Sequence, residues 1–259
     1  MRRYAGDQAQ HVVVIGGLSA PRRARFGGRR PRDADPGPVP VEVTRATVIS
    51  AGPLADEARA ETWLNEASGP AAEATVEESL AVLNRALHAR RVAAADPYAG
   101  EVARRHALVT RVGYGTGDEV AEGLWTAARE LPPPQRIARE SALRPQERFA
   151  ALLAARDVAL ASELLALRAR LDLDQGRDRE AALQLEAALA AAVSELEGWR
   201  ELHGMPERLD ELLALSPGVA EAAGAARAGA LDEAGRDAVV AALARLEAAL
   251  RARTARASF

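Results

Sequence analysis

The chain has 259 residues, of which 48% are hydrophobic and only 3% aromatic. Alanine and leucine supply much of the apolar content, and this composition favours helices over strands. All 34 basic residues are arginine and cysteine is absent, which excludes a Schiff-base lysine, a Walker lysine, disulfides and cysteine nucleophiles or metal ligands. The net charge is −3, but eight arginines against three aspartates give residues 1–40 a charge of +5, so the rest carries −8.

Nothing in the sequence indicates a membrane span or secretion. No run of about 18 apolar residues occurs. Residues 11–20, HVVVIGGLSA, have the character of a short signal-peptide core, but polar residues directly precede them and the apolar run is short. With the lack of cysteine, this predicts a cytoplasmic protein. GC-rich coding is the simplest explanation of the arginine bias, and we expect a bacterial source.

The N-terminal segment is basic and lacks hydrophobic periodicity. Residues 17–40 are rich in proline, glycine and arginine, so they bury too little apolar surface to offset the entropy of ordering. We interpret residues 1–40 as a disordered arm. Clustered arginines with one aromatic residue bind phosphate and stack on bases, and the alternative is a GC-biased leader without a function. The candidate nucleic-acid-binding residues are Arg22, Arg23, Arg25, Arg29 and Arg30.

Residues 41–132 are expected to form a small α+β region with two or three strands. Residues 41–50, VEVTRATVIS, alternate β-branched and polar residues and predict a strand, and residues 106–114 predict another. A short helix is expected after the first strand, and a longer one opens at Thr75 with Glu78 completing a capping box. The expected buried stripe of the longer helix is Val76, Leu80, Leu83 and Leu87.

Residues 111–123, RVGYGTGDEVAEG, place three glycines before an acidic pair and a predicted helix. The Walker pattern fails without lysine, and the dinucleotide pattern fails because no glycine stands at its sixth position. Asp118 and Glu119 would also repel phosphate at the helix N-terminus. We therefore predict a turn and a helix capped by Thr116 with Glu119, and no cofactor. The expected buried stripe is Val120, Leu124, Trp125, Ala128 and Leu131.

Beyond a proline-containing linker, residues 133–145, the sequence becomes almost purely helical over residues 146–259. Two periodic apolar segments flank the turn DLDQGRD, which predicts an antiparallel helical hairpin over residues 146–197. The expected inward residues are Phe149, Leu153, Leu160, Leu164, Leu167 and Leu171 on the first helix, and Ala182, Leu185, Leu189 and Leu196 on the second.

The segment RARLDLDQGRDREAALQLEAALA, which contains the turn of this hairpin, resembles the second half of a tetratricopeptide repeat. The matching small and large residues are Ala169, Gly176, Ala181, Leu185 and Ala188, whereas Arg168 and Asp172 stand where the family prefers leucine and tyrosine. One copy is visible, although such repeats need about three to bury a continuous core. The resemblance implies a protein-binding surface; the alternative is a close-packed helical hairpin outside the family.

A final helix is expected from about residue 231 to residue 252. Its apolar residues follow spacings of four, three and four, which are typical of a coiled-coil seam. The stripe covers fewer than two heptads, so packing within the core of one chain is the alternative to self-association. The candidate oligomer-interface residues are Val239, Leu243, Leu246 and Leu250.

No catalytic or metal site is recognisable. No serine lies in a G-x-S-x-G elbow, and the histidines lack metal-ligand spacing. His106 and Tyr114 are the least implausible acid–base pair. We therefore expect a mainly α-helical protein with a small α+β N-terminal part, acting as a non-enzymatic interaction or scaffold protein on a protein partner or through self-association. The alternative is a nucleic-acid-associated protein that uses the arm, and an enzyme with a scattered site ranks third.

Overall fold

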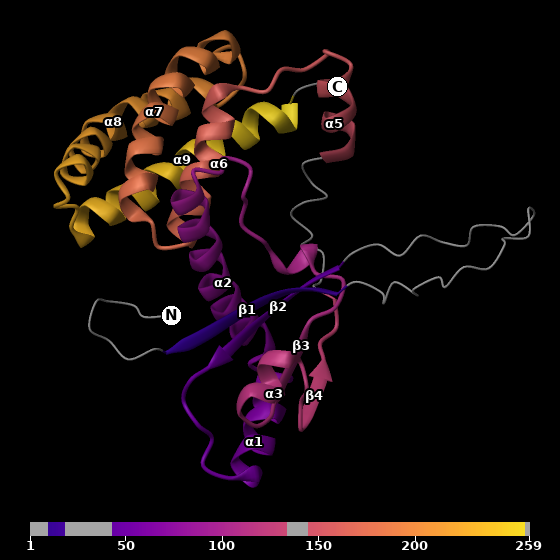
Figure 1. Ribbon diagram of the computed structural model, residues 1–259. Helices are drawn as coiled ribbons and strands as arrows, with labels where there is room; N and C mark the ends of the chain where they lie inside the picture. The colour runs from indigo at the N-terminus through magenta and orange to yellow at the C-terminus, as the bar shows by residue number, and fades with distance from the viewer. Residues whose placement is uncertain (1–9, 19–42, 134–144, 257–259) are drawn as a thin grey trace, which may run out of the picture. The chain divides into compact units, whose positions relative to one another are not determined.

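A computed structural model describes residues 10–18, 43–133 and 145–256. The chain divides into an N-terminal unit, Met1–Pro134, and a helical unit, Gln135–Phe259. Within the described residues, the strands lie in the N-terminal unit and the helical unit contains helices only (Figure 1). The predicted fold class, mainly α with a small α+β part, is confirmed.

The strands form two separate antiparallel pairs. In one pair, His11 stands opposite Ser50 and Leu18 opposite Val43. In the other, Arg111 stands opposite Glu130. The described residues thus contain four strands, where the sequence predicted two or three. Their bounds are β1 His11–Leu18, β2 Val43–Ser50, β3 Arg111–Tyr114 and β4 Ala127–Glu130.

Strand β1 corrects the interpretation of residues 1–40 as disordered throughout. Its sequence, HVVVIGGL, is rich in β-branched residues, which suit a pleated surface. The strand is formed with a partner, β2, that follows only after a long intervening segment. Local composition does not reveal a partner at that distance. The five arginines proposed to bind nucleic acid lie outside the described residues.

Two helices follow β2. Helix α1 (Glu57–Ala67) is capped by Asp56, whose carboxylate accepts the Arg59 N–H at 2.7 Å. Helix α2 (Ala72–Ala94) begins before the predicted start at Thr75, whose hydroxyl donates to the Ala71 carbonyl at 2.9 Å and caps nothing. The predicted capping box at Thr75 is therefore wrong. The small core of this unit contains Leu64, Ala67, Val76, Val112 and Leu131.

The loop after α2 is fixed by a side chain from that helix. Asn84 is buried, and its amide donates to the Val102 carbonyl at 3.0 Å and accepts the Val102 N–H at 2.9 Å. This loop continues into a short 3₁₀ helix, η1 (Arg104–His106), and then into β3.

The glycine-rich stretch forms a turn into a helix, as predicted, but the helix is much shorter. Helix α3 (Gly117–Glu122) follows Thr116 at the N-cap position, yet the threonine hydroxyl contacts the Glu119 carboxylate at 3.3 Å and does not cap the backbone. Gly123 ends the helix in the left-handed conformation, with φ of 84°. The chain then enters β4, so the predicted helical stripe from residue 120 to residue 131 is wrong.

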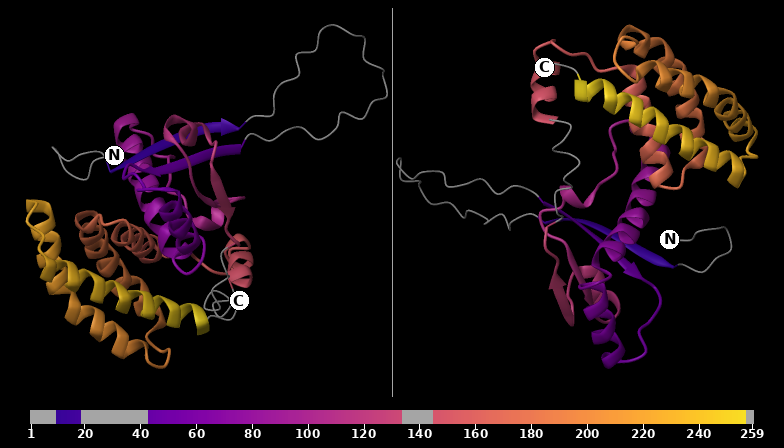
Figure 2. Two further views of the ribbon diagram at one scale, coloured as in Figure 1. Left: turned by 90° about the horizontal axis from the view of Figure 1, so that it is seen from below. Right: turned by 180° about the vertical axis from the view of Figure 1, so that it is seen from behind.

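The helical unit is built from five helices and a short 3₁₀ segment in its described part. Helix α7 packs against α6 on one side and α8 on the other, and α9 packs on α8 and contacts α6 and α7 (Figure 2). The elements of the helical unit are α5 Pro145–Leu153, α6 Ala161–Asp174, α7 Asp178–Glu195, η2 Leu196–Trp199, α8 Met205–Ala228 and α9 Glu233–Arg256.

The two helices of the predicted hairpin differ in how well their inward faces were predicted. On α7 and η2, the expected residues Ala182, Leu185, Leu189 and Leu196 all lie in the core. The other predicted helix is two helices, α5 and α6, separated by residues 154–160. Leu160 is buried, but the other five predicted inward residues are exposed: Phe149, Leu153, Leu164, Leu167 and Leu171.

Candidate functional site

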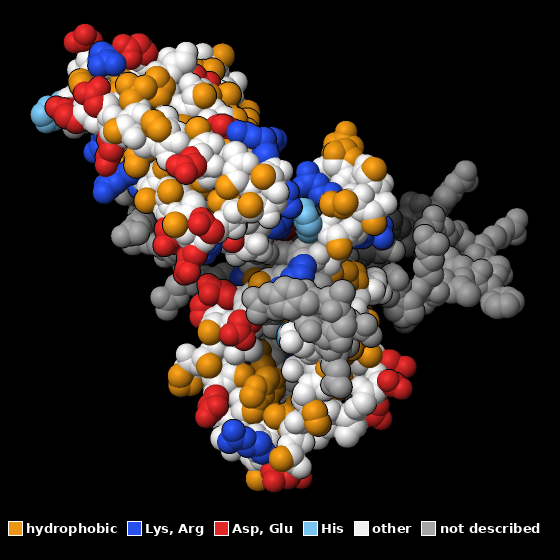
Figure 3. Space-filling model, turned by 90° about the vertical axis from the view of Figure 1, so that its left-hand side faces the viewer, with side chains coloured by type: hydrophobic (Ala, Val, Ile, Leu, Met, Phe, Trp, Pro, Cys, Tyr) orange, Lys and Arg blue, Asp and Glu red, His pale blue; other side chains and the backbone are white. Residues whose placement is uncertain are grey.

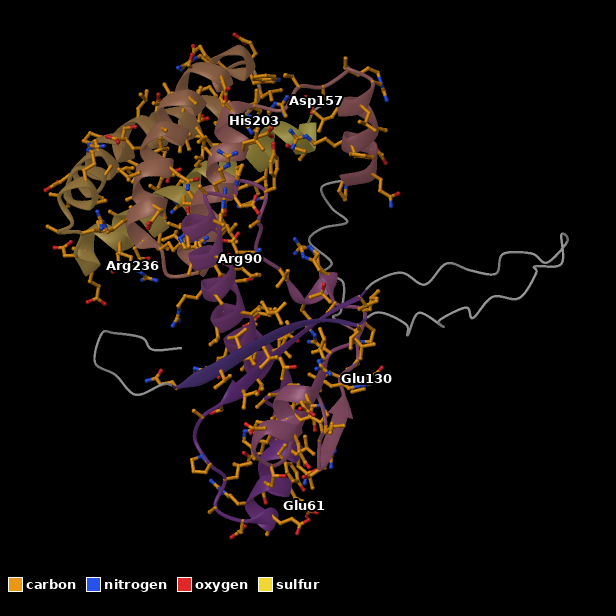
Figure 4. The ribbon with its side chains drawn as sticks, in the orientation of Figure 1. Glu61, Arg90, Glu130, Asp157, His203 and Arg236 are labelled. Atoms are coloured by element: carbon orange, nitrogen blue, oxygen red, sulfur yellow. The ribbon has the colours of Figure 1, made fainter. Side chains whose placement is uncertain are left out.

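Oppositely charged side chains meet where α5, the α5–α6 connection, α6 and the C-terminal part of α9 come together (Figure 4). Arg148 of α5 donates to Asp157 at 3.1 Å and to both oxygens of Glu163 at 2.6 and 2.8 Å. Arg253 of α9 donates to the other oxygen of Asp157 at 2.5 Å. We call these four residues the charged cluster. It ties together residues up to 105 positions apart in the sequence, from Arg148 to Arg253.

Arg253 is the most enclosed member of the charged cluster. Its side chain is 2% exposed, and its guanidinium carbon lies 4.6 Å from the centroid of the Trp199 ring. One nitrogen also lies 3.5 Å from a Glu163 oxygen. A buried guanidinium needs paired carboxylates to offset its desolvation, and an aromatic face adds cation–π attraction. Arg253 therefore joins α9 to the N-terminal end of α6.

Two further carboxylate contacts hold the first turn of α6. Glu195, at the end of α7, accepts the Ala161 N–H at 2.9 Å and both the N–H and the hydroxyl of Ser162 at 3.0 and 2.6 Å. Glu163 accepts the Leu160 N–H at 3.0 Å. These bonds satisfy donors that a helix N-terminus leaves unpaired, and the helix dipole favours negative charge there.

Two carboxylates of this region, those of Asp157 and Glu195, have lowered pKa values. Burial raises the pKa of Asp157, but hydrogen bonds from Arg148, the Val158 N–H and Arg253 outweigh it and hold the pKa below its ordinary value. Burial likewise raises the pKa of Glu195, and its bonds to Ser162 and Ala161 lower it further than burial raises it. Such groups are poor proton donors near neutral pH. The charged cluster therefore fits a structural clamp better than an acid–base site.

A hollow of about 550 Å³ lies in the helical unit beside the first turns of α7 and α9. Arg236 donates to Asp178 there at 3.1 Å (Figure 4). Arg179 donates to the Ala226 carbonyl at 3.0 Å. The other charged residues of its lining are Arg177, Glu180, Asp232 and Glu233. Arginines that are already bonded within the chain, next to several carboxylates, provide poor recognition for a phosphate or another anion.

Helix α6 carries a row of leucines on the side away from the core. Leu164, Leu167 and Leu171 are 54%, 67% and 38% exposed, and their spacing places them on one face. We call them the leucine stripe. The core side of the same helix presents Ala166 and Ala169. On the face of this unit that Figure 3 shows, apolar and charged side chains are interspersed. Such an exposed apolar row, on a helix whose core side is already packed, is a candidate contact surface.

The hairpin turn that resembles a tetratricopeptide repeat is closely packed. Ala169, Ala181, Leu185 and Ala188 are all fully buried. Asp172, which departs from the family pattern, accepts a hydrogen bond from Arg177 at 2.6 Å and another from Gln184. A buried charged residue thus closes the turn where the repeat has an aromatic one.

The candidate oligomer interface lies within the core of the helical unit. Val239, Leu243 and Leu246 are fully buried and Leu250 is 8% exposed. All four belong to the same core cluster as the inward residues of α7. Side chains enclosed by their own chain cannot also contact a second copy. Their burial favours core packing over a seam between chains.

His106 and Tyr114, the candidate acid–base pair, do not form a recognisable site. His106 accepts the Ala103 N–H at 3.2 Å within η1. Burial and the nearby charges of Glu61 and Glu57 raise the pKa of Tyr114, which opposes a role as a base. Within residues 10–18, 43–133 and 145–256, no group of three or more acidic or histidine side chains is arranged to hold a metal ion. No helix in those ranges has the length and apolarity needed to cross a bilayer.

No pattern in the sequence predicts the charged cluster or the exposure of the leucine stripe. Arginine and acidic residues are frequent throughout the chain, and nothing in their spacing couples Arg148 or Asp157 to Arg253. Comparison of the chain with family models, curated proteins and solved structures finds no match. Functional inference therefore rests on the geometry of the two units.

Proposed function

We propose that the protein is a non-enzymatic interaction protein of the cytoplasm and that its helical unit binds an amphipathic helix of a protein partner. The observation that carries this proposal is the leucine stripe of α6. Leu164, Leu167 and Leu171 follow the spacing with which one helix packs on another. The charged cluster supports it, because it fixes the N-terminal end of α6 to α5 and α9 through buried and partly buried ion pairs.

The resemblance to a tetratricopeptide repeat points the same way. Repeat proteins stack hairpins, and each hairpin buries its apolar faces against its neighbours. Helix α6 already packs against α7, so its opposite, leucine-bearing face corresponds to the side of a hairpin on which another helix packs. A rigid helix face loses little conformational entropy on binding, which favours affinity.

The proposal is tested by crosslinking and mass spectrometry in the native cell, comparing the full chain with Leu167→Glu. A charge in the middle of the leucine stripe should remove a specific crosslinked partner, because a carboxylate buried in an apolar contact pays its desolvation penalty unpaired. The matched control is Leu213→Glu on α8, where the wild-type leucine is 47% exposed. Both variants should keep the wild-type melting temperature.

The two variants separate the possible outcomes. A partner lost with Leu167→Glu but kept with Leu213→Glu supports the proposal. A set of crosslinked partners that Leu167→Glu leaves unchanged refutes the leucine stripe as the binding surface. Unfolding of Leu167→Glu would show that this side chain belongs to the core of the protein, and the proposal would again fail.

A further inference from the structure

Within the described residues, the sheet formed by β1 and β2 has only these two strands, so each of them is an edge strand. A two-stranded ribbon by itself is marginally stable in water, and unpaired edges act as templates for further strands. Helix α2 contacts both strands, whereas α3 packs on β2. Among the described residues, the side of the ribbon beyond β1 is therefore the more open of the two.

The hydrogen-bonding pattern between β1 and β2 shows which residues of β1 direct their backbone N–H and C=O groups toward that open edge. The Ala51 N–H donates to the Gln10 carbonyl at 2.9 Å, and these two residues extend the β1–β2 register by one position. In an antiparallel pair, hydrogen-bonded and non-hydrogen-bonded positions alternate. The even-numbered residues of β1 therefore bond to β2, and the backbone N–H and C=O groups of Val13, Ile15 and Gly17 point outward.

This edge lacks the features with which proteins usually protect a free strand. Those features are prolines, charged side chains, bulges and very short strands. Strand β1 is eight residues long and contains neither proline nor an arginine or acidic residue. Val12, Ile15 and Leu18 are 48%, 51% and 49% exposed. The edge is apolar and accessible, and it suits a strand that is equally free of charge.

We propose that this edge pairs antiparallel with β1 of a second copy, forming a four-stranded sheet in the order β2–β1–β1–β2. Antiparallel pairing of a strand with itself closes around a twofold axis, so both copies use the same surface. Outward residues must meet outward residues, and the register centred on Val14 satisfies this condition. It places His11 opposite Gly17 and Val13 opposite Ile15, so that no two like charges face each other.

The self-paired register is favourable in its side chains as well as in its backbone. The Val13–Ile15 pair and its twofold-related counterpart form about four backbone hydrogen bonds. The Val13–Ile15 pair is of the β-branched type that stabilises neighbouring strands. The contact of one strand with another buries less than the roughly 1,200 Å² of a stable interface. We therefore expect a weak dimer whose population rises with protein concentration.

A single cysteine tests the register, because the chain has no cysteine of its own. In the proposed dimer, Val14 lies opposite the same residue of the second copy at a non-hydrogen-bonded position, about 4.5 Å between Cα atoms. That distance is within the range of a disulfide. Val14→Cys should therefore form a disulfide-linked dimer on mild oxidation. Val12→Cys is the matched control, since it lies four residues, or about 13 Å, out of register with its own copy.

A proline at each edge tests which strand pairs. Val13→Pro removes only an outward N–H and leaves the β1–β2 hydrogen bonds intact. Val48→Pro makes the same change at the opposite position of β2. Light scattering after size exclusion, over a concentration series of the full chain, should show that Val13→Pro is monomeric and that Val48→Pro still dimerises. Ile15→Lys and Ala46→Lys repeat the comparison with charge and serve if a proline variant unfolds.

The outcomes decide the proposal separately from the proposed function, because Leu167→Glu on the helical unit should leave this dimer unchanged. Concentration-dependent dimers that Val13→Pro or Ile15→Lys abolishes, with crosslinking of Val14→Cys alone, support pairing at β1. A wild-type chain that remains monomeric throughout the series overturns it. Equal crosslinking of Val12→Cys and Val14→Cys, or a dimer lost only with the β2 variants, also overturns it.

Discussion

Replacing Arg253 with alanine should destabilise the helical unit more than any exposed arginine substitution. The guanidinium is 2% exposed, donates to Asp157 at 2.5 Å, and lies over Trp199. Truncating one partner of a buried ion pair costs about 3–5 kcal/mol, because the remaining charges stay buried without their partner. Arg148 still neutralises Asp157 and Glu163, so we expect the lower part of that range.

That loss is a large share of the stability of a domain, which is about 5–15 kcal/mol. For a unit of this size, about 3 kcal/mol corresponds to a fall of roughly 10 °C in the melting temperature. Calorimetry of the full chain measures this shift. Arg245→Ala is the matched control on the same helix, since its pair with Glu211 is exposed at both ends and is worth at most about 1 kcal/mol.

The comparison has a clear negative outcome. If Arg253→Ala lowers the melting temperature no more than Arg245→Ala does, the charged cluster does not fix α9 to α6 and the clamp interpretation fails. Arg253→Lys should recover part of the loss, because the charge returns without the planar group that reaches two partners. A lysine variant as unstable as the alanine variant would show that a positive charge without the planar guanidinium does not restore stability.

Four further changes have expected results. The pKa values of Asp157 and Glu195 are lowered in the folded chain. The stability that they contribute is fully present above about pH 4 and is lost as the pH falls through the folded-state pKa values. Asp157→Asn should therefore flatten the acid side of a plot of melting temperature against pH. Ala95→Gly should stabilise α2 by about 0.5–1 kcal/mol in denaturant titrations, since φ is 50° at that C-cap. Gly115→Ala should lower the free energy of unfolding by about 1–3 kcal/mol, because the added Cβ would lie 2.8 Å from a methyl of Val120. Neither ATP nor NAD should shift the melting temperature of the wild type or of this variant. Replacing the five arginines of residues 22–30 with glutamine should abolish any salt-dependent nucleic-acid binding and keep β1, which deletion of residues 1–38 would remove.

The sequence predicted those parts of the fold that depend on strong local patterns. The strand predicted at residues 41–50 is found at Val43–Ser50 and follows from alternation. The inward face of α7 follows from 3.6-residue periodicity, and the turn at Gly176 from a glycine, whose φ is 69°. The misplaced start of α2 follows from the same local logic, because Thr75 has the chemistry of a cap but its hydroxyl bonds back to Ala71.

The features that the sequence did not predict depend on distant partners. Strand β1 requires β2, and the charged cluster requires α5, α6 and α9 to be in place together. A pair such as Asp157 and Arg253 has no signature in a chain with 34 arginines and 37 acidic residues. The candidate sites were correspondingly harder to predict than the fold.

Helix α6 shows why hydrophobic periodicity alone gave the wrong inward face. Leucines recur on one side of the helix, and a periodicity argument turns the more hydrophobic side inward. Helix α6 instead packs its alanines on α7, where Ala169 and Ala181 are fully buried, because small side chains let two helix backbones approach closely. The larger residues Leu164 and Leu167 remain outside. A helix that keeps its more hydrophobic side exposed although its core is complete gains most when a second helix covers that side, which is the physical basis of the proposed interaction.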